Sequence, residues 1–175
     1  MRNANTEGRG EITISDLIRA SLRMRPDRIV VGEVRGPEAI DMLQAMNTGH
    51  DGSISTGHGN SAVDMLSRLE VMVLRGSNIP LLAIRKQIAS ALDLIIHLAR
   101  LRDKTRRVVE ISEVIGLDGD EIALNSLFKF VETGVDEQDR IVGGLCATGN
   151  QLHRAEKLKL AGFDLSAVAG GPLHG

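Results

Sequence analysis

The hydrophobic and polar positions follow two different patterns along the chain. Up to about residue 101, short apolar runs bounded by turn residues alternate with longer segments in which apolar residues recur at helical spacing. The short runs predict strands at 29–31 and 53–56, and the helical spacing predicts helices at 15–24, 38–46, 62–74 and 81–92, with Ser15 and Ser61 as N-caps. Strands that alternate with helices are typical of an α/β fold built on a parallel sheet.

From residue 94 onward, the apolar runs follow one another without helical segments between them. They predict strands at 94–101, 107–115, 128–131 and 140–145, with a hairpin signal at Asp118-Gly119-Asp120 and one short helix within 151–161. We therefore expect three parts: an α/β core at 1–101, a small antiparallel β appendage with its terminal helix at 102–162, and a flexible tail at 163–175.

Composition narrows the class of protein. Lys and Arg total 21 and Asp and Glu 23, so the formal net charge of -2 does not favour nucleic acid as a partner. Trp and Tyr are absent and Phe occurs three times, which nearly excludes base stacking on aromatic side chains. The single Cys146 cannot form an intrachain disulfide. No apolar run reaches the length of a membrane span, and the first residues lack a signal-peptide core, so we expect a soluble cytoplasmic protein.

A carboxylate follows the first predicted strand directly. Ile29-Val30-Val31 is followed by Gly32 and Glu33, which places Glu33 at the carboxyl end of a buried strand. A carboxylate in this position can hold the water shell of Mg²⁺ or orient an attacking water in phosphoryl transfer. It can equally form an ion pair with Arg35 at the rim of the sheet, and position alone leaves both interpretations open.

Two histidines, His50 and His58, follow glycine-rich turns near the ends of successive elements. An imidazole can stabilise charge that develops in phosphoryl transfer, but a lone histidine is more often a hydrogen-bonded structural residue. The chain has no H-x-H, HExxH or cysteine pair, which argues against a catalytic zinc. A serine hydrolase is also disfavoured, because neither Ser53 nor Ser55 lies in a G-x-S-x-G motif.

Several separate sequence words carry a family resemblance. The segment PDRIVVGEVRGPEA resembles the Walker B segment of the type II/type IV secretion ATPases, and MNTGHDGSISTGHGNS resembles their histidine box. Within that superfamily, RMRPDRIVVGEVRG and DMLQAMNTGHDGS are most similar to the Flp (tight-adherence) pilus-assembly ATPases of the CpaF type. The likeness continues through 84–91 and more loosely to about Gly149.

The resemblance implies part of a RecA-like P-loop NTPase core that uses ATP and Mg²⁺. It implies that Glu33 acts in catalysis and on the Mg²⁺ water shell, with His58 nearer the chemistry than His50. It further implies a set of nucleotide-binding residues: Arg23, Arg35, Thr48 and His50. Arg23 would face the nucleotide of a neighbouring subunit, whereas the alternative from the sequence alone is a solvated surface charge. The implied assembly is a hexameric ring that works with pilus or secretion platform proteins of the inner membrane, peripheral to that membrane through these partners.

The phosphate-binding loop of this family is absent from the sequence. No G-x-x-x-x-G-K-[ST] occurs among the 175 residues, so we expect the carboxy-terminal portion of a longer motor ATPase, inactive by itself. The alternative is a non-catalytic fragment or degenerate paralogue that acts as a docking module. The family also usually has an aliphatic residue where Gly57 stands and a small non-glycine residue where Gly59 stands, so we expect a loosened backbone around His58.

Overall fold

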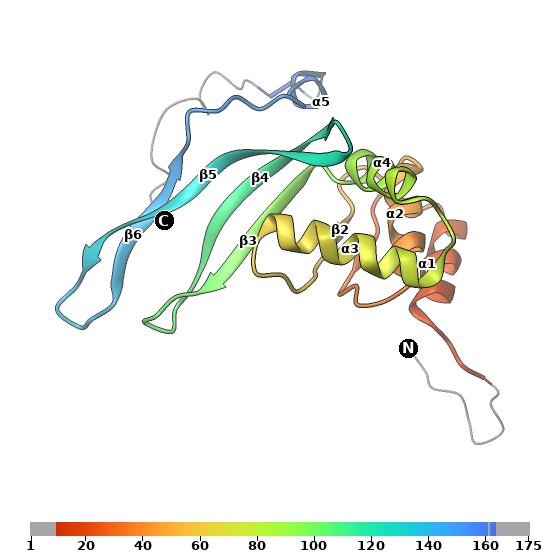
Figure 1. Cartoon of the computed structure of the whole chain (residues 1–175), viewed down its shortest axis with the longest axis horizontal. Coiled ribbons are helices and arrows are strands. Elements are labelled where there is room, and N and C mark those ends of the chain that lie inside the picture. Colours follow the sequence, from red (N-terminus) through yellow and green to blue (C-terminus); the bar gives the residue numbers. More distant parts are fainter. Residues whose placement is uncertain (1–9, 161, 164–175) are drawn as a thin grey trace. The chain divides into compact units, whose positions relative to one another are not determined.

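The computed structural model describes residues 10–160 and 162–163 (Figure 1). The chain divides into two compact units between Leu92 and Asp93, and each is described by itself. No helix in the described ranges has both the length and the apolar character needed to cross a membrane.

The first unit alternates helices with two very short strands. Its elements are α1 (Ile14–Arg23), β1 (Val30–Val31), α2 (Ala39–Asn47), β2 (Ile54–Ser55), α3 (Ala62–Gly76) and α4 (Leu81–Ala91). β1 and β2 pair in parallel, with Val30 opposite Ile54 and Val31 opposite Ser55. The predicted α/β alternation is therefore confirmed for this unit.

The helix starts show which capping predictions were right. Ser61 caps α3 as predicted, because its hydroxyl accepts a hydrogen bond from the N–H of Asp64 at 3.0 Å. The cap of α1 was misplaced at Ser15, since Thr13 caps the helix instead. Thr13 and Asp16 form a capping box in which the side chain of each accepts from the backbone N–H of the other. This reciprocal pair satisfies two donors at once, which a cap at Ser15 would not.

An aliphatic core holds the first unit together. α2 packs against α1, α3 and α4. The most deeply buried side chains come from these helices and show almost no solvent exposure: Leu43, Val73, Ile84 and Ile88. Burial of each such side chain contributes about 1.5–3 kcal/mol, and this core contains no aromatic residue.

The second unit is an antiparallel sheet with one short helix. Its elements are β3 (Leu94–Arg100), β4 (Arg106–Asp118), β5 (Glu121–Val135), β6 (Ile141–Ala147) and α5 (Glu156–Leu160), and the strands lie in the order β3-β4-β5-β6 (Figure 1). The predicted hairpin is present, and Gly119 takes the positive φ of +59° that its turn requires. Val114, Leu127 and Ile141 are buried in this unit.

The boundary between the two units lies earlier than the sequence indicated. We expected it near Leu101, but β3 pairs with β4 along its length, from Leu94 opposite Glu113 to Arg100 opposite Arg106. An apolar run such as 94–101 does not by itself name its partner strand, so only the pairing with β4 assigns β3 to the second unit. The expected tail lies outside the described residues from position 164 onward.

Candidate functional site

The ends of the two parallel strands bring three of the predicted site residues together. Glu33 follows β1 after one glycine, and His58 follows β2. The guanidinium of Arg35 donates to Glu33 Oε2 at 2.7 Å, and His58 Nε2 lies 2.7 Å from Glu33 Oε1. The Glu33 side chain is 27% exposed, whereas those of Arg35 and His58 are more than 70% exposed. The carboxylate is thus the inner member of a group whose other members reach solvent.

The surroundings of Glu33 favour its charged form. The hydrogen bond from Arg35 lowers the pKa of Glu33 more than partial burial raises it, and the nearby charge of Arg35 and the proximity of His58 lower it further. Glu33 is therefore ionised at neutral pH. Its Oε1 atom is buried and has no aligned hydrogen-bond donor among the described residues, although His58 Nε2 is close. Such an oxygen can accept a further hydrogen bond.

Backbone and side-chain contacts hold this strand-end region in place. Thr56 donates its hydroxyl to the carbonyl of Gly32 at 2.6 Å, directly before Glu33. Glu38 Oε1 accepts from the backbone N–H groups of Arg35 and Gly36 at 3.0 and 3.1 Å. The sequence analysis assigned no role to Thr56 or Glu38. A hydroxyl at a strand end and a carboxylate three residues after Arg35 are the signals that indicate such turn contacts.

Thr48 and His50 lie at the end of α2, where their polar atoms bind the helix rather than Glu33. The Thr48 hydroxyl donates to the carbonyl of Ala45 at 3.0 Å, and His50 Nδ1 lies 3.1 Å from the same carbonyl oxygen. Ser53 connects this turn to β1, because its hydroxyl donates to the carbonyl of His50 and accepts from the N–H of Ile29. Thr48 and His50 therefore form a separate group that the structure anchors to α2.

Arg23 lies in the last turn of α1 and is exposed. An exposed arginine in the last turn stabilises the negative end of the helix dipole. This position fits the solvated-charge alternative and leaves the side chain accessible from outside the unit.

An open groove of about 1070 Å³ adjoins Glu33 and Arg35. One wall is α1, which contributes Leu17 and Ile18, and the other is the segment from Arg28 to Glu38. The groove therefore has apolar walls with charged groups at the segment that carries Glu33.

The two glycines around His58 have a packing role. A Cβ atom at Gly57 would lie 2.3 Å from Met65 Cε, and one at Gly59 would lie 3.1 Å from the Met65 backbone nitrogen. Neither glycine has the positive φ that only glycine adopts easily. α3 therefore packs directly against the loop that carries His58, and the structure gives a reason for the missing side chains other than a loosened backbone.

These residues suit chemistry on a polyanionic substrate. Glu33 is an ionised acceptor whose buried oxygen faces His58, and a carboxylate of this kind fits a role in the water shell of a divalent cation. Arg35 and His58 can donate to phosphate oxygens from the exposed side of the carboxylate. The donor set fits Mg²⁺ held through water, while the Gly-rich loop for phosphates is not among these residues.

Comparisons with known proteins agree on one family. The model of the family "Type II/IV secretion system protein" matches residues 1–150. The putative conjugal transfer protein Rv3659c of Mycobacterium tuberculosis (strain H37Rv) is 45% identical over 118 residues, which are 67% of this chain and 33% of that protein. The type IV secretion system protein PtlH of Bordetella pertussis is 41% identical over 112 residues, 61% of this chain and 33% of PtlH. This chain thus spans about a third of the length of these relatives.

A solved structure supports the fold. The VirB11 ATPase from the Brucella suis type IV secretion system, in complex with sulphate, is similar with a TM-score of 0.55 and 34% identity over 58% of this chain and 32% of that chain. The likeness supports a partial NTPase-like domain within this chain. Because the family model matches most of its length, the chain belongs to the type II/IV secretion system protein family.

Proposed function

We propose that this chain supplies the catalytic carboxylate and histidine of a secretion motor ATPase. The observation that supports this most directly is the ionised Glu33, held between Arg35 and His58 at the ends of two parallel strands. Family membership and the likeness to the VirB11 ATPase add to it. The phosphate-binding loop would come from another part of a longer protein, because these 175 residues do not contain it.

Each predicted residue has a role in this proposal. Glu33 corresponds to the Walker B carboxylate and orients the water shell of Mg²⁺ or the attacking water. His58 donates a hydrogen bond toward the transferred phosphate. Arg35 leaves its bond with Glu33 and binds a phosphate oxygen instead. Bound Mg²⁺ would neutralise charge on the phosphate oxygens.

The remaining predicted residues act from further away. Thr48 and His50 support the nucleotide-binding region from the end of α2, where both lie against the Ala45 carbonyl. Arg23 reaches from its exposed position on α1 toward a nucleotide on a neighbouring subunit.

We further propose a biological setting from the sequence resemblance. The words around Glu33 and His50 are most similar to CpaF-type ATPases of tight-adherence pili. In this setting the intact protein has a RecA-like core, forms a hexameric ring in the cytoplasm and drives pilin assembly or export through platform proteins of the inner membrane. The names of the relatives, which refer to conjugal transfer and type IV secretion, support a secretion motor in general.

The test uses the longer protein that contains this sequence and measures ATP turnover and ATP binding separately. Glu33→Gln removes a charge that is needed mainly in the transition state, so turnover should fall by about 100-fold or more while ATP still binds. His58→Ala should reduce turnover less, because it removes a positioning and partial-charge contribution. Met72→Leu, a near-isosteric change in the core, is the control and should leave turnover almost unchanged.

A non-catalytic docking module is the competing proposal, and the ion pair between Glu33 and Arg35 fits it, because such a pair can be purely structural. If Glu33→Gln kept more than half of the parent turnover, the catalytic assignment of Glu33 would be wrong. The docking module would then be the better explanation of the chain.

A further inference from the structure

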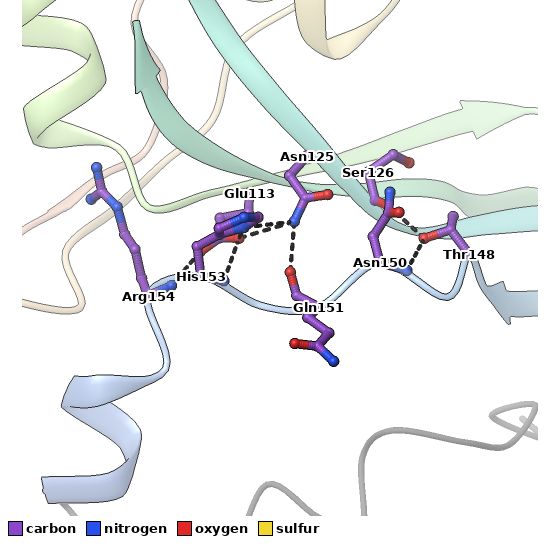
Figure 2. Close-up of polar contacts among 8 residues, drawn as sticks. All are labelled: Glu113, Asn125, Ser126, Thr148, Asn150, Gln151, His153 and Arg154. Carbon is purple, nitrogen blue, oxygen red and sulfur yellow. Dashed lines mark hydrogen bonds and ion pairs between the residues drawn. The ribbon is translucent and has the colours of Figure 1, made fainter.

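A second polar cluster lies in the antiparallel sheet, away from Glu33 in the sequence. Glu113 on β4 has no solvent exposure, and it lies next to Val114, which is an apolar core residue. Figure 2 shows the Glu113 carboxylate directed toward the segment that follows β6. A buried carboxylate is costly unless hydrogen bonds satisfy its oxygens, so the donors around Glu113 determine whether this arrangement is stable.

Backbone N–H groups of the segment after β6 supply most of these donors. Glu113 Oε1 accepts from the N–H of Arg154 at 2.6 Å, and Glu113 Oε2 accepts from the N–H of His153 at 2.9 Å (Figure 2). The His153 Nδ1 atom is 3.3 Å from the same Oε2. One side chain of β4 thus binds two consecutive peptide groups about 40 residues further along the chain.

Asn125 and Asp93 extend the same attachment. Asn125, opposite Glu113 on β5, donates its Nδ2 to Glu113 Oε2 at 3.2 Å and to the carbonyl of Gln151 at 2.8 Å. Asp93 Oδ1 accepts from Arg154 Nη1 at 2.5 Å. The segment 151–154 is therefore held by side chains of the sheet unit and not by a strand ladder.

The charge of Glu113 is retained at neutral pH. Burial raises the pKa of Glu113. Hydrogen bonds from the backbone of His153 and Arg154, and from the side chains of Asn125 and His153, together lower this pKa by more than burial raises it. Charge-assisted hydrogen bonds of this kind are about twice as strong as neutral ones.

The residues directly before this segment are held by neutral hydrogen bonds. The Thr148 hydroxyl and the Asn150 side-chain amide both donate to the carbonyl of Ser126. Between them, Gly149 has a φ of +90°, so the chain turns there before it reaches Gln151. Beyond Arg154, α5 begins at Glu156, and Leu160 in its last turn is 88% exposed.

We propose that the buried Glu113 carboxylate is the anchor of a separately opening arm, defined as residues 151–160. The arm pivots at Gly149, and loss of the anchoring charge releases it while β3–β6 remain folded. The physical basis is that Glu113 accepts from two consecutive backbone N–H groups of the arm and also from Asn125, which in turn holds the Gln151 carbonyl, so this carboxylate is central to the attachment. The sheet is held by its own ladders and by buried Val114, Leu127 and Ile141. A region with few apolar contacts of its own can open without global unfolding.

Hydrogen exchange on the full 175-residue chain tests this proposal. Glu113→Gln keeps the side-chain shape, removes the charge and directs an amide N–H₂ at one of the two backbone donors. Exchange of the His153 and Arg154 amides should become at least about tenfold faster, while the β4–β5 ladder amides keep their protection. Glu132→Gln is the matched control: Glu132 lies on β5 in an exposed pair with Arg102, so the arm should be unaffected.

Several results would contradict the proposal that Glu113 anchors the arm. Unchanged exchange at His153 and Arg154 in Glu113→Gln would show that the charge does not hold the arm. An equal rise in exchange across the β4–β5 ladder, or failure of this variant to fold, would show that Glu113 belongs to the global fold and that no separate arm exists. Asn125→Ala gives a second measurement, because it removes the hydrogen bond to the Gln151 carbonyl. In this variant too, amide exchange in the arm should become faster while the sheet keeps its protection. Unchanged exchange in the arm would also refute the proposal.

Discussion

The ion pair between Arg85 and Glu70 offers a direct test of how α3 and α4 are held together. Arg85 Nε lies 2.8 Å from Glu70 Oε1 and Nη2 lies 3.4 Å from Oε2, so the contact is bidentate. Both side chains are mostly buried, with exposed fractions of 15% and 14%. Neutralising Glu70 alone, in Glu70→Gln, removes the negative charge that lies against the largely buried guanidinium of Arg85.

The expected cost follows from this burial. Two unit charges about 3 Å apart attract by about 5 kcal/mol at an effective dielectric constant of about 20, and desolvation of both groups offsets much of that. Removing one partner of a fully buried pair costs about 3–5 kcal/mol. Because this pair keeps some contact with water, we expect Glu70→Gln to cost about 2–3 kcal/mol of unfolding free energy.

A double-mutant cycle separates the pair from the other contacts that Arg85→Met would remove. Unfolding by urea, followed by the circular dichroism signals of both the helices and the sheet, should give a coupling free energy of about 2 kcal/mol between Glu70 and Arg85. Asp136 and Arg140 form the same type of pair in an exposed hairpin, 31% and 61% exposed, and their cycle should show no coupling beyond the experimental error. A Glu70–Arg85 coupling no larger than in this control would refute the argument from burial.

Two further predictions concern the loop and strand ends around the proposed catalytic site. Gly59→Ala should destabilise the chain by about 1–3 kcal/mol in urea unfolding, because the new Cβ would press on the Met65 backbone. Gly57→Ala should cost less, since the new Cβ would meet the flexible end of the Met65 side chain, which can move. The opposite order of the two costs would contradict this reasoning. Arg35→Ala should raise the pKa of Glu33, followed by carboxyl carbon NMR. Because the pKa of Glu33 is lowered, the ionised carboxylate contributes stability at neutral pH, and this stability is lost as pH falls through that pKa. An unchanged titration midpoint of Glu33 in Arg35→Ala would show that Arg35 does not cause the lowered pKa.

The local pattern predicted the first unit well because its elements depend on near neighbours. The helical spacing of apolar residues, the cap at Ser61 and the glycine after α2 are all readable within one or two turns of helix. The meeting of Glu33 and His58 also followed from a general rule, since the carboxyl ends of adjacent parallel strands share an edge. The ion pair with Arg35, which the sequence left as an alternative, is present together with the His58 contact.

The sheet of the second unit was less predictable because its register depends on partners far along the chain. In the sequence, Val109 and Ile111 alternate with Glu110 and Ser112, and in a regular strand the two polar residues would face the side opposite the apolar ones. The pairing of β4 with β5 instead shifts register between Ile111 and Ser112, and the three residues from Ser112 to Val114 are all buried. A β-bulge inserts an extra residue and changes which side chains share a face, and no local pattern records its position.

Glu113 shows the limit of the sequence most clearly. A glutamate within a strand pattern is read as an exposed residue, because an unpaired buried carboxylate would be too costly. Its burial becomes possible only when the backbone N–H groups of His153 and Arg154, some 40 residues away, donate to its carboxylate. Because almost every residue type has a backbone N–H, the sequence does not indicate which residues supply these donors. The same dependence makes the proposed arm separable: β4 has its own ladder partners, whereas the arm relies on a carboxylate that β4 provides. Charge on Glu113 therefore controls the arm more than the arm controls the sheet.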